Sequence, residues 1–112
     1  DLVLYNLFKN SLEACKNEAE PLIIISVEQS EQKAVIKIQD NGPEISEDLV
    51  NSIFIPKVSQ KTDGLGLGLS ICKALAESQG GSLTAIRNEQ GHLVMKLCLP
   101  MAVPAKDIRK NQ

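Results

Sequence analysis

The sequence predicts an α+β fold: a two-layer α/β sandwich in which helices pack on one face of a mixed, mostly antiparallel sheet. Segments with helical spacing of apolar residues alternate with two pairs of short β-branched strands joined by tight turns. The chain has 112 residues, 43% of them hydrophobic, which is enough for a single core. We expect one domain over residues 1–101, truncated at its N-terminus, and a polar tail over residues 102–112.

Residues 1–17 are predicted to form the first helix, because apolar side chains recur there every three or four positions. Those expected to face the core are Leu4, Leu7, Phe8, Leu12 and Cys15. A second stripe of the same helix is polar and consists of Asn6, Asn10, Glu13 and Asn17. The helix therefore has one side for packing and another for solvent or a ligand.

Residues 22–29 and 34–40 are rich in β-branched side chains and are predicted to form two strands. The polar turn between them is so short that an antiparallel hairpin is the simplest arrangement. The breaker sequence Asn41-Gly42-Pro43 follows and ends the second strand.

The second half of the chain predicts a short helix, a long helix and another hairpin. Ser46 is a suitable N-cap for the short helix, which begins with two carboxylates. Residues 65–79 have helical spacing and end at Gly80, a plausible C-cap backed by Gly81. Residues 82–88 and 92–100 are predicted to pair around a turn that contains Gly91.

Composition excludes several classes of protein. Twelve basic against fourteen acidic residues give a net charge of −2, which disfavours a nucleic-acid partner. The longest apolar run is far shorter than the ~20 residues that span a bilayer, so we expect no membrane contact. Three cysteines without a Cys-x-x-Cys motif predict buried thiols and a cytoplasmic location. The single histidine, His92, has no partner at metal spacing, and we expect it on the surface.

The densest motif is the run of glycines Gly64, Gly66 and Gly68 that alternates with leucines at the expected start of a helix. Each glycine inside a helix costs roughly 1 kcal/mol relative to alanine, so a purely structural origin is unfavourable. The spacing fits neither a Walker loop nor a dinucleotide fingerprint. We therefore expect backbone amides and a helix N-terminus that bind an anion, most often phosphate.

Two polar positions have a plain and a functional interpretation. Asn6 and Asn10 lie one turn apart and form either a solvated helix face or, through Asn10, a site for a hard cation such as Mg²⁺. Asp40, at the end of a hydrophobic strand, either stabilises the turn that follows or is a carboxylate that accepts a hydrogen bond from an adenine amine. In the second case Gly42 leaves room for the flat ring.

Together, residues 6–14, 40–45, 53–61 and 64–71 resemble the asparagine box, first glycine box, phenylalanine box with ATP lid, and second glycine box of one family. This is the catalytic ATP-binding domain of sensor histidine kinases, which is related to DNA gyrase, MutL and heat-shock chaperone ATPases. The style of the boxes is similar to kinases of the nitrogen- and dicarboxylate-sensing type. The resemblance covers nearly the whole chain.

The resemblance implies a role for each matching residue, with ATP and Mg²⁺ as cofactors. Asn10 would bind Mg²⁺, and Asn6 would support the metal shell or the phosphates. Asp40 would hold the adenine amine, with Gly42 and Ile45 lining the ring. The residues that would contact the phosphates are Lys61, Gly64, Gly66 and Gly68, with Leu69 starting the helix beneath them.

The implied reaction is transfer of the γ-phosphate to a histidine on a separate dimerisation domain that this chain lacks. Family members that hydrolyse ATP carry a glutamate where this chain has Asn6, and an amide cannot accept a proton from water. The chain begins at Asp1 without Met, so we expect a piece of a longer protein, one that an inner membrane can anchor. The resemblance also implies a response regulator receiver domain as a partner, and the fragment alone is not expected to autophosphorylate.

Three departures from the family pattern keep other functions open. Glu44 stands at a usual glycine, Ile55-Pro56-Lys57 changes the phenylalanine box, and Val94 replaces a threonine that often supports the adenine aspartate. One alternative is therefore a degenerate nucleotide-binding or docking module without kinase activity. Another is a serine kinase of the anti-sigma-factor type, which shares the same boxes.

Overall fold

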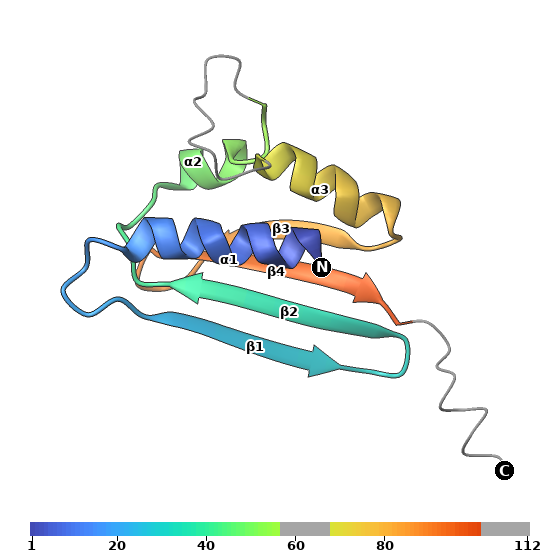
Figure 1. The fold of residues 1–112 in the computed structure, drawn as a ribbon. Helices are drawn as coiled ribbons and strands as arrows, with labels where there is room; N and C mark the ends of the chain where they lie inside the picture. Colours follow the sequence, from blue (N-terminus) through green and yellow to red (C-terminus); the bar gives the residue numbers. More distant parts are fainter. Residues whose placement is uncertain (57–67, 102–112) are drawn as a thin grey trace, which may run out of the picture.

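A computed structural model of the chain describes residues 1–56 and 68–101 (Figure 1). In chain order its elements are α1 (Leu2–Cys15), β1 (Ile23–Gln29), β2 (Lys33–Asp40), α2 (Glu47–Ser52), α3 (Leu69–Ser78), β3 (Ser82–Arg87) and β4 (Leu93–Pro100). The helices lie on one face of a sheet with the strand order β1-β2-β4-β3 (Figure 1). This confirms the two-layer fold, and every strand pairing in the described sheet is antiparallel.

The register of the sheet decides which side chains reach the helices. Ile38 pairs with Ile25 on one side and with Met95 on the other, so these three side chains share one face. Ile38 and Met95 are buried, because this is the face that the helices cover. The buried core shared by the sheet, α1 and α3 consists of Val3, Leu7, Ile38, Cys72, Ala76, Leu83, Met95 and Leu97.

Helix α1 begins at its cap Asp1, whose Oδ1 accepts hydrogen bonds from the N–H groups of Val3 (2.7 Å) and Leu4 (3.2 Å). The expectation that Phe8 and Leu12 face the core is wrong, because their side chains are 38% and 46% exposed. The stripe that meets the sheet contains Val3, Leu7, Ser11 and Cys15. At 100° per residue, the centre of the buried stripe is therefore rotated from the expected one by about 60°.

Helix α3 ends in a Schellman motif, which confirms the predicted cap. The N–H of Gly81 donates to the carbonyl of Ala76 (2.9 Å), and the N–H of Gly80 donates to that of Glu77 (3.0 Å). Gly80 has φ +85°, a conformation that side chains rarely adopt. Gly81 is needed for a different reason, since a Cβ there would overlap the carbonyl oxygen of Cys98.

The predicted short helix and second hairpin are also present, with local contacts that explain them. The hydroxyl of Ser46 accepts a hydrogen bond from the Leu49 N–H (3.1 Å) at the start of α2. In the turn between β3 and β4, Oδ1 of Asn88 accepts hydrogen bonds from the N–H groups of Gln90 and His92, each 2.9 Å. These side-chain contacts are short-range, which is why the sequence predicts them well.

The histidine and cysteine expectations need correction. His92 is half-buried rather than on the surface, and its Nδ1 is enclosed without a hydrogen-bond partner among the described residues. Cys15 and Cys72 are buried as expected, and burial raises the pKa of the Cys72 thiol. Cys98 is only half-buried. None of the helices in residues 1–56 and 68–101 has the length and apolar composition that crossing a bilayer requires.

The two glycines after α3 give the first testable prediction. Gly81→Ala should lower the free energy of unfolding by about 3 kcal/mol, because its methyl group meets a backbone carbonyl that cannot move independently. Gly80→Ala is the control and should cost only ~1 kcal/mol, because it adds conformational strain without an overlap. Urea unfolding followed by circular dichroism measures both, and equal losses would contradict this account.

Candidate nucleotide site

Asp40 is the charged residue around which the candidate site is built. It is the last residue of β2 and continues the alternation of Ile36 and Ile38 on the helix-covered face of the sheet. Its side chain is only 7% exposed. A carboxylate buried at a core position is costly unless it accepts hydrogen bonds, so its contacts show what holds it there.

One oxygen of Asp40 is engaged within the turn that follows β2. Oδ1 accepts a hydrogen bond from the N–H of Gly42 at 2.9 Å. Oδ2 accepts no hydrogen bond from any residue that the structure describes. The plain turn interpretation of Asp40 is therefore observed, and it leaves the second oxygen for the predicted ligand contact.

Gly42 has a structural role that the sequence interpretation missed. A Cβ at this position would lie 2.6 Å from the carbonyl oxygen of Ala14 in the last turn of α1. The neighbouring Asn41 joins the same turn to the α1–β1 connection, since its side chain bonds the Leu22 N–H and the Glu20 carbonyl, both at 2.9 Å. The dipeptide Asn41-Gly42 thus fixes Asp40 against α1. In the sequence, only the turn-forming pattern Asn41-Gly42-Pro43 indicated such a contact.

Asn6 and Asn10 lie on the flank of α1 away from Phe8 and Leu12, but in different environments. Asn6 is 3% exposed, and its amide donates to the carbonyl of Leu2 at 2.8 Å. Asn10 is half-buried, and its side chain has no hydrogen-bond partner in the described part of the chain. The expectation of one uniform polar stripe is therefore wrong, because Asn6 belongs to the interior.

The packing of α1 on α3 brings Asn10 toward the start of α3. Val3 and Leu7 of α1 share the core with Cys72 and Ala76 of α3. The two helices run in opposite directions (Figure 1). The part of α1 that follows Leu7, including Asn10, therefore lies toward the N-terminus of α3, which precedes Cys72.

The N-terminus of α3 has no side-chain cap. Gly68 is the N-cap and is exposed, and no atom of residues 1–56 or 69–101 lies within 4 Å of the position of a Cβ there. Two residues that flank the segment between α2 and α3 pack against the core. They are Phe54, after α2, and Leu69, the first residue of α3. The predicted phosphate residues Lys61, Gly64 and Gly66 lie outside the described residues.

Two of the departures from the family pattern can be located. The side chain of Glu44 lies against Gly91, where a Cβ would be 3.1 Å from its Oε1. Val94 pairs with Gln39 and is therefore on the sheet face opposite the side chain of Asp40, so its expected place beside that aspartate is wrong. Leu93, one residue earlier, points to the same face as Asp40.

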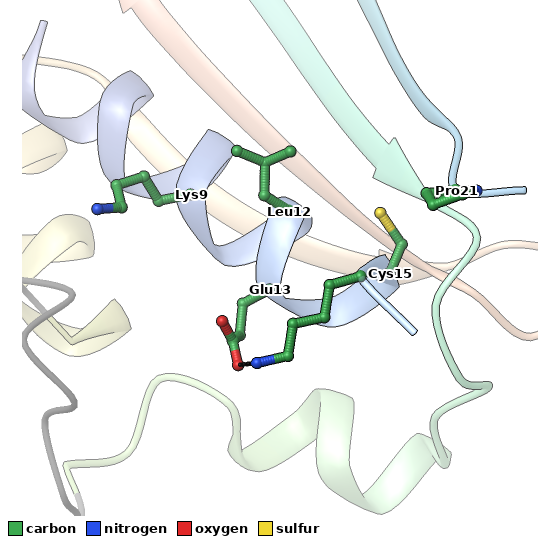
Figure 2. A pocket seen from close by; sticks show the side chains of 6 residues that line it. Lys9, Leu12, Glu13, Cys15 and Pro21 are labelled. Atoms are coloured by element: carbon green, nitrogen blue, oxygen red, sulfur yellow. Dashed lines mark hydrogen bonds and ion pairs between the residues drawn. The ribbon is translucent and has the colours of Figure 1, made fainter. Parts of the chain in front are cut away.

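A separate cavity of about 360 Å³ lies beside α1 and the α1–β1 connection (Figure 2). Its lining residues are Lys9, Leu12, Glu13, Cys15, Lys16 and Pro21. Glu13 and Lys16 form an ion pair at 2.6 Å. Figure 2 shows the side chains of Glu13 and Leu12 pointing to different sides of α1. None of the predicted nucleotide residues lines this cavity, so it is distinct from the site around Asp40.

Comparison with known proteins identifies the family. Residues 1–103 match the model of the histidine kinase-, DNA gyrase B- and HSP90-like ATPase family. The chain belongs to this family. The resemblance expected from the four boxes is thereby confirmed, and the domain is of the ATP-binding type that the family name describes.

Two similar proteins are a sporulation kinase and a sensor histidine kinase. Sporulation kinase D of Bacillus subtilis is 40% identical over 81 residues, covering 72% of this chain and 16% of that protein. Sensor histidine kinase ZraS of Escherichia coli is 34% identical over 107 residues, covering 94% of this chain and 22% of that protein. This chain therefore spans about a fifth or less of each of these two relatives.

A solved structure agrees with the fold. The nucleotide-free catalytic domain of histidine kinase ThkA superposes with a TM-score of 0.72 at 36% identity, covering 88% of this chain and 64% of that one. ThkA has also been solved in complex with the response regulator protein TrrA, with a TM-score of 0.71 at 31% identity, covering 91% of this chain and 28% of that one.

The close contact at Gly42 gives a prediction for the site. Gly42→Ala should destabilise the domain by about 2–3 kcal/mol, because the new methyl group overlaps the backbone of Ala14. Gly68→Ala, where the methyl group meets no atom of the described residues, should cost less than about 1 kcal/mol. Thermal unfolding of both variants measures the difference, and a Gly42→Ala variant as stable as the control would refute the contact.

Proposed function

We propose that this domain binds Mg-ATP between α1, the end of β2 and the start of α3, and presents the γ-phosphate to a histidine on a separate dimerisation domain. The observation that carries the proposal is Asp40, a buried carboxylate with one oxygen held in the turn and the other without a partner in the described chain. Such an oxygen is suited to accept a hydrogen bond from the exocyclic amine of adenine.

The remaining nucleotide contacts follow from the positions of the boxes. Gly42 and Ile45 would line the purine. Lys61, Gly64, Gly66 and Gly68 would contact the phosphates, and Leu69 would begin the helix beneath them. The uncapped N-terminus of α3 supports this assignment, because its backbone N–H groups and the helix dipole favour an anion.

Asn10 would hold Mg²⁺, with Asn6 supporting the metal shell from the preceding turn. The half-buried amide of Asn10 offers the neutral oxygen donor that a hard cation accepts. Residues 1–56 and 68–101 contain no group of three His, Cys, Asp or Glu side chains arranged to hold a metal ion, so the phosphates would complete the shell. When bound, Mg²⁺ supplies charge neutralisation on the phosphates.

Transfer to a protein side chain is favoured over hydrolysis of ATP. The residue one turn before Asn10 is Asn6, whose nitrogen already donates to the Leu2 carbonyl and whose amide is no base for water. His92 is a poor acceptor for the phosphoryl group, because it is half-buried just before β4 with Nδ1 enclosed. The acceptor histidine would therefore belong to the dimerisation domain, and the chain alone should not autophosphorylate.

Beyond the reaction itself, we propose a cytoplasmic signalling context. A response regulator receiver domain would take the phosphoryl group from the histidine, and the ThkA–TrrA complex supports this kind of partner.

Substitution of the central aspartate tests the proposal directly. Asp40→Asn should weaken binding of Mg-ADP at least tenfold, about 1.4 kcal/mol, because the amide cannot reproduce both acceptor contacts of the carboxylate. Asp48→Asn, on the exposed surface of α2, is the control and should bind as the wild type does. Isothermal titration calorimetry that gives the same dissociation constant for Asp40→Asn and wild type would reject the assignment.

A further inference from the structure

The end of β3 and the turn that follows it hold both backbone groups of Ile45, the residue proposed to line the purine. The N–H of Ile45 donates to the carbonyl of Gly91 at 2.9 Å. The carbonyl of Ile45 accepts a hydrogen bond from Nε of Arg87 at 2.7 Å, across 42 residues of sequence. The donor of this second contact is ionised, which makes the hydrogen bond stronger than a neutral one.

The turn that makes these contacts is itself well ordered by local bonds. Asn88 accepts two backbone N–H groups through its side chain, and its own N–H donates to the carbonyl of His92 at 2.9 Å. Gly91 has φ +88°, and the absence of a Cβ leaves the space that the side chain of Glu44 occupies. The turn thus presents the Gly91 carbonyl, and the end of β3 the Arg87 guanidinium, to the segment after Asp40.

The other end of this segment is fixed independently. Asn41 bonds to the α1–β1 connection, and Gly42 contacts Ala14 of α1. Residues 41–45 therefore connect Asp40 to α2 with attachments at both ends. Removing Arg87 releases the Ile45 carbonyl and leaves the attachments near Asp40 intact.

We propose that Arg87 is a positioning residue for the adenine side of the nucleotide site. Its guanidinium fixes the backbone of Ile45 in the segment that follows Asp40 and so sets the affinity for the purine without itself touching the nucleotide. The inference rests on the proposed function. It goes beyond it by assigning purine selectivity to a residue on β3 that belongs to none of the four boxes.

The test compares two nucleotides in Arg87→Ala, Arg87→Lys and the control Lys33→Ala, which changes an exposed cation at the far end of β2. Calorimetry with Mg-ADP and Mg-GDP gives the ratio of their affinities for each protein. Arg87→Ala should weaken Mg-ADP about 5- to 10-fold with little change for Mg-GDP, so the ratio falls. Arg87→Lys should recover part of the ratio, because an ammonium can also donate to the Ile45 carbonyl.

Three results would overturn the inference: an unchanged ADP affinity in Arg87→Ala, equal losses for both nucleotides, or a ratio that falls equally in Lys33→Ala. Urea unfolding identifies any variant that does not fold. If Arg87→Ala is such a variant, the ratio in Arg87→Lys decides, with a partial fall expected and an unchanged ratio counting against the role. A wild-type domain that binds neither nucleotide would reject the proposed function itself, and this inference with it.

Discussion

The burial of the Asp40 carboxylate is the constraint on which the rest of the site depends. Strand β2 alternates so that Ile36, Ile38 and Asp40 all face the helices, and an acid at the third position is costly unless it is hydrogen-bonded. The N–H of Gly42 supplies one bond. The second oxygen accepts no hydrogen bond from the described residues, and a purine amine is a suitable partner for it.

Packing of the core sets the geometry around this carboxylate. Val3 and Leu7 of α1 meet Cys72 and Ala76 of α3, which fixes the start of α3 relative to the asparagines. The last turn of α1 lies so close to Gly42 that no larger residue fits. Substitutions that shift α1 would therefore change the geometry at the metal side and at the adenine side of the site together.

Local rules account for what the sequence predicts correctly, and tertiary packing accounts for what it does not. The cap at Ser46, the glycine at the end of α3 and the two hairpins depend on contacts within a few residues, and all were predictable. The rotation of α1, which exposes Phe8 and Leu12, depends on how the helix lies on the sheet. The face of Val94, the half-burial of His92 and the contact of Gly42 with Ala14 likewise follow from pairing partners distant in sequence. The roles of Lys61, Gly64 and Gly66 remain predictions.

The most direct measurement is a crystal structure of the domain with Mg²⁺ and a non-hydrolysable ATP analogue. The account predicts the purine amine within hydrogen-bond distance of Asp40 Oδ2, the metal at the side-chain oxygen of Asn10, and the phosphates at the N-terminus of α3. A nucleotide bound elsewhere, for example in the cavity beside Leu12 and Pro21, with no contact to Asp40, would contradict it.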